Sequence, residues 1–226
     1  MMNQAATKST GRRPFLRAGA SGKYIMAPIL AALLASLPAG TAGRNGEYMI
    51  YTGTYTRDDS RGIYAHRFNP STGGITPVGL AAEAVHPAFL AVHPSRQFLY
   101  AVNEVSNYEG QNGSVSAFSI DFKTGHLKLL NKVSSGGGDP CHLAVHKSGE
   151  WLTVSNYGSG SVSLLPIEES GKLGRISMLV RHRGWGADPK RQEGPHAHSV
   201  NFSPDGRVLL VSDLGLDKVM VYRLDR

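Results

Sequence analysis

The chain has 226 residues, a formal net charge of +7, 27 glycines, 12 prolines and one cysteine. A single cysteine excludes an internal disulfide framework and cysteine-rich zinc sites. The glycine and proline content, with few long helical periodicities after the first 42 residues, indicates an all-β chain punctuated by turns.

Residues 1–42 have the layout of an export signal. Five basic residues come first: Lys8, Arg12, Arg13, Arg17 and Lys23. An uncharged apolar stretch over 25–37 follows, and it is too short for a membrane-spanning helix. The segment 10–17 also resembles a twin-arginine signal. We therefore predict a signal peptide over 1–42 and export to the periplasm; a disordered basic tail on a cytoplasmic protein is the alternative.

The net positive charge belongs mainly to this leader. Residues 43–226 hold 19 basic and 17 acidic residues, with no stripe of Lys and Arg. This balance argues against a nucleic-acid partner, and no membrane contact is expected once the leader is removed.

Residues 43–226 repeat one phrase, an apolar strand that ends in polar residues. Clear copies lie over 98–104, 151–157 and 208–214, and a fainter one starts at Tyr48, so the steps are 50, 53 and 57 residues. Such a period in a strand-rich chain is typical of β-propeller blades. Within the second copy we expect strands over 98–103, 113–120 and 127–133.

Length limits the number of blades. About three and a half four-stranded blades fit into residues 43–226, whereas closed propellers have roughly four to eight. We therefore predict a partial propeller domain, the first part of a larger ring, and expect this chain to be a fragment.

The strand ends and the linkers between blades are the candidate binding positions. A propeller should bring equivalent strand ends together, so we predict ligand contacts from Asn103, Glu104, Asn156 and Asp213; capping of turns is the alternative for these and for Tyr157. The linkers begin at Pro87, Pro140 and Pro195. The third spacing is two residues longer than the others, which predicts an insertion that introduces His196 and His198.

Six blocks in order carry a family resemblance: 52–56, 62–64, 140–145, 155–162, 191–198 and 213–217. Together they resemble the seven-bladed lactonase propellers, which include bacterial 6-phosphogluconolactonases and fungal carboxymuconate lactonizing enzymes. The match runs from Tyr48 to the last residue, but only over the first half of a family member. The resemblance implies seven blades, lactone chemistry and no metal.

Opening a lactone requires a base that activates water, and a donor or cation that holds the oxyanion. His142 is the candidate base, because a histidine pKa near 6.5 leaves much of the ring neutral at working pH. The equivalent positions carry Phe89 and Ser199, so the scaffold does not demand histidine there. A histidine hydrogen-bonded between blades is the alternative.

Arg191 is the second catalytic candidate. It lies in a long loop over 181–192, where binding residues are expected, and a guanidinium can hold a carboxylate, a phosphate or an oxyanion. The resemblance also implies an arginine at this motif. An ordinary solvated cation is the alternative.

His196 and His198 are predicted to bind substrate. Residues two apart on a strand point the same way, so a metal held with Asp213 and Asp217 is an alternative. No dense ligand cluster and no dinucleotide fingerprint is visible in the sequence, and we predict no metal and no cofactor.

The function predicted from the sequence is hydrolysis of a small-molecule sugar lactone, similar to 6-phosphogluconolactonase, in carbohydrate metabolism. The alternatives are a non-catalytic propeller that binds a protein or carbohydrate, and a muconate-type lactonizing isomerase. Because phosphorylated sugar lactones arise inside cells, export favours an unphosphorylated substrate. The fragment alone is expected to be weakly active or inactive, since part of the channel wall is missing.

Overall fold

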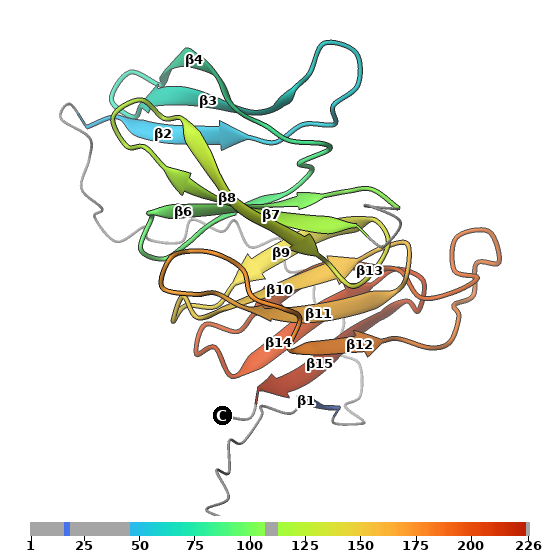
Figure 1. The fold of residues 1–226 in the computed structure, drawn as a ribbon. Coiled ribbons are helices and arrows are strands. Elements are labelled where there is room, and N and C mark those ends of the chain that lie inside the picture. Colours follow the sequence, from blue (N-terminus) through green and yellow to red (C-terminus); the bar gives the residue numbers. More distant parts are fainter. Residues whose placement is uncertain (1–15, 19–45, 107–112, 225–226) are drawn as a thin grey trace, which may run out of the picture.

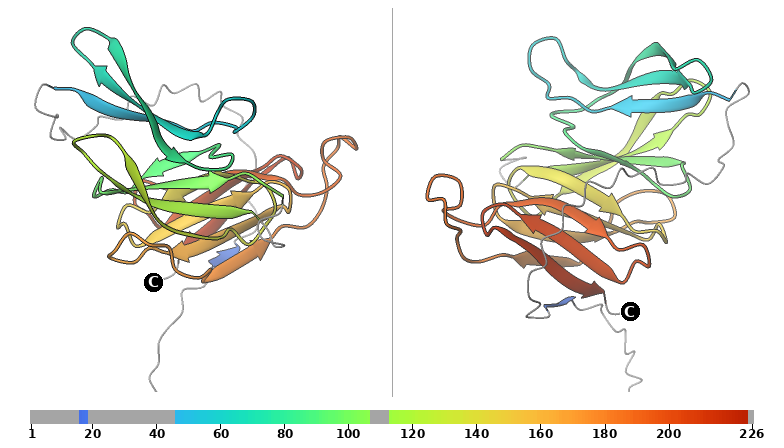
Figure 2. Two further views of the ribbon diagram at one scale, coloured as in Figure 1. Left: turned by 45° about the horizontal axis from the view of Figure 1, so that its top comes forward. Right: turned by 180° about the vertical axis from the view of Figure 1, so that it is seen from behind.

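The computed structural model describes residues 16–18, 46–106 and 113–224. Over these ranges the chain forms four antiparallel sheets that follow one another in chain order (Figure 1, Figure 2). The described residues include no α-helix, and so none long and apolar enough to cross a bilayer. The prediction of an all-β chain built from blades is confirmed.

Each sheet is one blade of the repeat. The first contains β2 (Tyr48–Thr52), β3 (Gly62–Asn69) and β4 (Gly74–Glu83). The second contains β5 (Leu90–Val92), β6 (Phe98–Asn103), β7 (Ser114–Ile120) and β8 (Leu127–Ser134). The third contains β9 (Pro140–Val145), β10 (Trp151–Asn156), β11 (Ser161–Pro166) and β12 (Met178–Arg181). The fourth contains β13 (Ala197–Phe202), β14 (Val208–Asp213) and β15 (Lys218–Leu224).

A short strand from the predicted leader joins the fourth blade. β1 (Leu16–Ala18) pairs with β15, with Leu16 opposite Leu224 and Ala18 opposite Tyr222. It completes a sheet of order β1-β15-β14-β13. The rest of residues 1–42 lies outside the described residues, so the signal peptide stays a prediction.

The structure corrects the alignment of the first repeat by one residue. Tyr51 of β2 lies opposite Ala65 and packs toward blade 2, and Tyr100 of β6 lies opposite Ala117 and packs toward blade 3. Tyr51 therefore corresponds to Tyr100, a step of 49 residues rather than 50. The correction matters because a shift of one residue on a strand exchanges its two faces.

The predicted two-residue insertion before Asp213 is wrong. Asn156 lies opposite Pro140 and Asp213 lies opposite Ala197, so both spacings are 16 residues. Ala197, not Pro195, therefore corresponds to Pro140. The strands β9 and β13, which are the inner strands of blades 3 and 4, each contain a bulge. Cys141 in β9 and His198 in β13 have no partner in the ladder.

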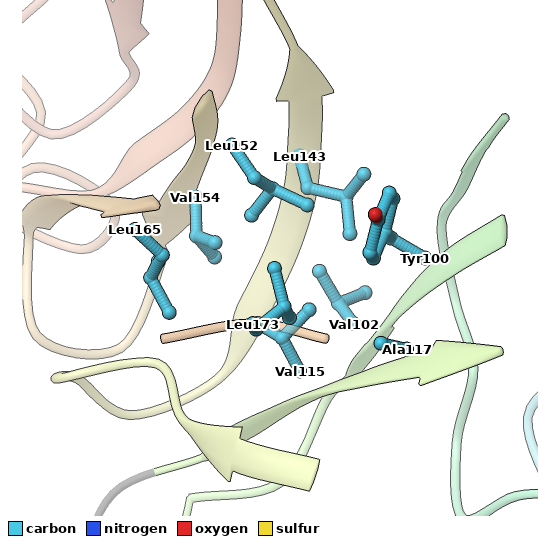
Figure 3. Packing of buried hydrophobic residues seen from close by; sticks show 9 residues of the cluster. All are labelled: Tyr100, Val102, Val115, Ala117, Leu143, Leu152, Val154, Leu165 and Leu173. Atoms are coloured by element: carbon cyan, nitrogen blue, oxygen red, sulfur yellow. The ribbon is translucent and has the colours of Figure 1, made fainter. Parts of the chain in front are cut away.

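The core consists of the boundaries between blades. Between blades 2 and 3, Tyr100 and Val102 of β6 meet Leu143 of β9 and Leu152 and Val154 of β10 (Figure 3). All five are at most 1% exposed. Burying each such aliphatic or aromatic side chain contributes about 1.5–3 kcal/mol. These contacts hold neighbouring sheets face to face and so fix the strand ends that carry the candidate site.

The outer faces of the first and last sheets are not covered in the described part of the chain. Leu210 of β14 is 39% exposed, whereas the corresponding Tyr100 and Thr153 are 0% exposed. Val219 and Val221 of β15, and Tyr48 and Ile50 of β2, are also exposed. The sheets thus form an arc with an apolar face at each end.

Candidate active site at the boundary between blades 3 and 4

A repeated set of backbone hydrogen bonds joins the end of each of three strands to the linker that leads into the same blade. After β6, β10 and β14, the first N–H donates to a linker carbonyl 18 residues earlier: Glu104 to His86, Tyr157 to Asp139, and Leu214 to His196. The strand ends at Asn103, Asn156 and Asp213 are therefore equivalent in space as well as in sequence.

The ring of Tyr157 is the centre of a polar and aromatic cluster. His196 stacks on it with ring centroids 4.4 Å apart, and His198 meets it edge-on at 5.7 Å. Arg191 donates from Nη2 to the Tyr157 hydroxyl at 3.5 Å. Three residues predicted from the sequence thus surround one side chain, and both Arg191 and His198 are exposed to solvent.

His142 lies beside this cluster, between three blades. Its ring lies against Phe89 of the preceding linker, with centroids 3.9 Å apart and the ring planes tilted by 32°, and its Nδ1 accepts a hydrogen bond from the backbone N–H of Val200 in β13 at 3.4 Å. Burial, and then the nearby charge of His198, lowers the pKa of His142 to about 4. The ring is therefore neutral at pH 7, but it is a weaker base than the unperturbed histidine that we assumed from the sequence.

The contact with Val200 also fixes which nitrogen carries the proton. Because the backbone N–H of Val200 donates to Nδ1, the proton of the neutral His142 ring lies on Nε2. In this state His142 offers a hydrogen-bond donor at Nε2. Accepting a proton there would require the other tautomer and the loss of the bond from Val200.

Asn103 and Asn156 hold loops. The amide of Asn103 donates to the Val85 carbonyl at 2.8 Å, and the amide of Asn156 donates to the Ser135 carbonyl at 3.2 Å. Both side chains are at most 2% exposed. A substrate could reach them only if these loops moved, so the contacts favour the turn-capping alternative.

Glu104 lies at the end of β6 in blade 2. Its Oε2 accepts the hydroxyl of Tyr55, from the first blade, at 2.7 Å. This hydrogen bond, with burial and the charge of Glu104, raises the pKa of Tyr55 to about 12. Glu104 is therefore tied to the blade 1 side of the site, and its predicted contact with substrate stays a prediction.

Asp213 is buried and bound to residues that sequence reasoning did not single out. Its Oδ2 accepts a hydrogen bond from Nδ1 of His182 at 2.5 Å. The hydroxyl of Tyr222 lies 2.8 Å from Nε2 of the same ring. Its Oδ1 accepts the backbone N–H groups of His196 and Leu216 at 2.8 and 3.0 Å. Burial opposes ionisation of Asp213, but the bonds from His182, His196 and Leu216 outweigh it and lower the carboxyl pKa.

One sequence signal could have revealed these partners. Asp213 replaces the asparagine of the other two strand ends, and a carboxylate accepts but cannot donate. A buried carboxylate therefore requires donors nearby, and His182 lies at the start of the loop that precedes β13.

Within the described residues, the alternative of a metal held by His196 and His198 lacks the further ligands that a metal site needs. Over the described ranges, no three His, Cys, Asp or Glu side chains gather closely enough to hold an ion. Nδ1 of His196 is bonded to the Tyr157 carbonyl at 3.1 Å, and His198 lies on the bulge, where the rule of alternating faces does not apply. Burial raises the pKa of the Cys141 thiol to about 11 and keeps it protonated.

Comparisons with known proteins agree with this architecture. The curated 6-phosphogluconolactonase of Bacillus subtilis is 34% identical over 178 residues, which cover 79% of this chain and 50% of that protein. That of Formosa agariphila is 31% identical and covers 78% and 50%. This chain therefore spans about half the length of the curated relatives it matches.

Solved structures show the same fold. A putative 6-phosphogluconolactonase from Bacteroides fragilis superposes with a TM-score of 0.74 at 38% identity, covering 79% of this chain and 49% of that one. The periplasmic gluconolactonase of Pseudomonas aeruginosa gives 0.72 at 32% identity, covering 78% and 50%. The family model described as "Lactonase, 7-bladed beta-propeller" matches residues 49–226. The chain belongs to the seven-bladed β-propeller lactonase family.

Proposed function

We propose that this protein hydrolyses a sugar lactone, in the manner of the 6-phosphogluconolactonases and gluconolactonases that it is similar to. The observation that carries the proposal is the cluster at the boundary between blades 3 and 4. There Arg191, His196 and His198 surround Tyr157, and His142 lies within electrostatic reach of His198.

The cluster contains the groups that ester hydrolysis needs. The oxygen of a water molecule attacks the lactone carbonyl, the ring C–O bond breaks, and the departing oxygen takes a proton to give the open hydroxy acid. Arg191 is always charged and can stabilise the negative charge that develops on the carbonyl oxygen. His142 carries the proton of the attacking water. In the tautomer protonated at Nδ1, which forms when the bond from Val200 is lost, Nε2 accepts this proton, and the imidazolium then gives it to the departing oxygen.

The location and the substrate are linked. We propose that residues 1–42 direct export, so that the protein meets an unphosphorylated aldonolactone. The leader composition supports this, and one structural relative is described as a periplasmic gluconolactonase. Fusing residues 1–42 to a reporter and locating the reporter by cell fractionation would test the leader; a reporter retained in the cytoplasm would contradict it.

We also propose that further blades complete the ring. The exposed apolar face of blade 4 and the half-length match to relatives support this. The DNA beyond codon 226 provides the test, because blade-like units in frame should follow. In that case residues 43–226 alone should be weakly active or inactive, and robust turnover by this fragment would contradict the expectation.

The experiment that tests the activity is base consumption at constant pH, with glucono-lactone and its 6-phosphate as substrates and protein expressed from the complete gene. Arg191→Ala should lower the enzymatic rate by about 100-fold or more, because an oxyanion donor is lost. Lys190→Ala, at the neighbouring loop position, is the matched control and should retain the wild-type rate. If Arg191→Ala and His142→Ala both turn over normally, these assignments are wrong; binding of sugar without turnover would favour a non-catalytic propeller.

A further inference from the structure

Asp213 differs from its counterparts in what it binds. At the ends of β6 and β10, an asparagine amide donates to a carbonyl of the linker that leads into the same blade. At the end of β14, the carboxylate of Asp213 instead accepts three N–H groups, from His182, His196 and Leu216. The same position in the repeat therefore has a different network in blade 4.

The network continues from Asp213 to the other side of the blade. Tyr222 belongs to β15, and burial raises its pKa to about 12, so its hydroxyl keeps its proton and donates to Nε2 of His182. Nδ1 of His182 then donates to Asp213. The side chains of His182 and Asp213 are 1% and 0% exposed, so neither can touch a substrate in solution.

Asp213 fastens both ends of the loop that carries Arg191. His182 immediately precedes the loop over 183–195, and His196 immediately follows it. One oxygen of Asp213 holds the side chain of His182, and the other holds the backbone of His196. The loop end is also tightly packed, since a Cβ atom placed on Gly215 would lie 1.8 Å from the Gly194 carbonyl oxygen.

The loop in turn presents the exposed residues of the site. The backbone N–H groups of Arg191 and Gln192 donate to the Asp188 carbonyl, and the amide of Gln192 donates to the Leu214 carbonyl at 2.9 Å. Arg191 then reaches the Tyr157 hydroxyl, and His196 stacks on the Tyr157 ring. Movement of either loop end would shift Arg191 and His196 relative to Tyr157.

We propose that Asp213, His182 and Tyr222 form a positioning unit that holds the 183–195 loop, so that Arg191 and His196 face the Tyr157 side of the site. These three residues act on catalysis only through the loop. The kinetic part of this inference rests on the proposed lactonase function, whereas the structural part does not.

Hydrogen exchange of the loop amides tests the structural part. Asp213→Asn keeps the shape of the side chain but weakens its bonds to three donors, and exchange over 183–196 should become about 10-fold faster or more. Tyr222→Phe removes one hydroxyl and should accelerate the same amides by about 3-fold. Tyr100→Phe is the matched control, because it removes another buried tyrosine hydroxyl, which is bonded to the Gly171 carbonyl, and should leave the loop unchanged.

A double-mutant cycle tests the kinetic part. If Asp213 acts through Arg191, then Asp213→Asn should lower kcat/KM about 10-fold in the wild type and by less than about 2-fold in an Arg191→Ala background. A general loss of stability would lower kcat/KM by the same factor in both backgrounds. Melting temperatures of all variants show that the folded proteins are compared.

The two parts can fail separately. If the wild type hydrolyses no lactone, the proposed function is wrong, and exchange still decides whether the unit holds the loop. Unchanged loop exchange in folded Asp213→Asn and Tyr222→Phe would overturn the positioning unit, whatever the activity. Equal kinetic losses in the two backgrounds would overturn its action through Arg191.

Discussion

The boundary between blades 2 and 3 and the boundary between blades 3 and 4 share one scaffold but carry different side chains. At the first, the backbone N–H of Asp139 donates to the Val105 carbonyl at 3.1 Å; at the second, the side chain of His196 donates to the Tyr157 carbonyl at 3.1 Å. Asp139 and His196 correspond in the repeat, so the contact from this linker position to the preceding blade is made by backbone in one place and by an imidazole in the other. The repeat supplies positions, and a few substitutions at those positions create the site.

The inner strands show the same contrast. Phe89, His142 and Ser199 stand at corresponding places before or within β5, β9 and β13. Of these three blades, only blade 3 has an imidazole there, and Phe89 supplies the apolar surface that the His142 ring lies against. The chemistry of blade 3 therefore depends on a neighbour in blade 2.

The largest effect is expected from making blade 3 resemble its neighbours at this position. His142→Ser introduces the residue of blade 4, which the scaffold accommodates. Turnover of gluconolactone should fall by about 10²–10⁴-fold, because a proton-transfer group is lost. The melting temperature should change little. Retained turnover would show that His142 is only a packed histidine.

The packing of the two boundaries can be compared by matched truncations. Leu152→Ala and Leu209→Ala remove corresponding buried leucines from β10 and β14, which are 0% and 1% exposed. Each should lower the free energy of unfolding by about 2–5 kcal/mol, measured with urea. A loss below about 1 kcal/mol in either would mean that the boundary is looser than its burial indicates.

The Tyr157 ring is a third feature that distinguishes the boundary between blades 3 and 4 from the boundary between blades 2 and 3. Tyr157→Ala removes the surface on which His196 stacks and the hydroxyl that Arg191 contacts, so KM for the lactone should rise by about 10-fold. Tyr157→Phe keeps the stack and loses one long hydrogen bond, and should change KM by less than about 3-fold. Equal effects of the two variants would contradict the role of the ring.

The smallest effect is a dependence of stability on pH. The pKa of His142 is about 4 in the folded chain and near 6.5 when the chain is unfolded. Between these values only the unfolded chain binds the proton, so acidification from pH 6.5 to 4 should destabilise the fold, by about 1 kcal/mol after allowance for partial exposure. Urea unfolding of His142→Ser should show a flatter pH dependence. An identical slope in both proteins would place the titration elsewhere.

Sequence reasoning located the blades because apolar strands and their polar ends recur at nearly regular steps. It aligned the first strand with the other copies one residue out of register. The reason is that β2 is apolar on both faces, so its alignment becomes visible only from the packing of Tyr51 toward blade 2. It also predicted a two-residue insertion that this interval does not contain, because Pro195 resembles Pro87 and Pro140, while the ladder pairs Ala197 with Asp213.

The site was predicted in part. Arg191, His196 and His198 stood out as unusual side chains in one loop and linker, and the structure gathers them around Tyr157. His182 and Tyr222 could not be predicted as a pair, because they lie 40 residues apart and meet only through the packing of blade 4. The lowered pKa of His142 depends on burial, which sequence spacing does not report.

The central claim is the proposal that a sugar lactone binds and is hydrolysed at the boundary between blades 3 and 4. The most direct measurement is a titration with gluconate, the product of the proposed reaction, followed by the NMR signals of the histidine rings, each assigned with a single substitution. The account predicts saturable shifts of His142, His196 and His198, and none of His126, which lies exposed in the turn between β7 and β8 at the far end of blade 2. Shifts absent from all three site histidines, or equal at His126, would contradict it.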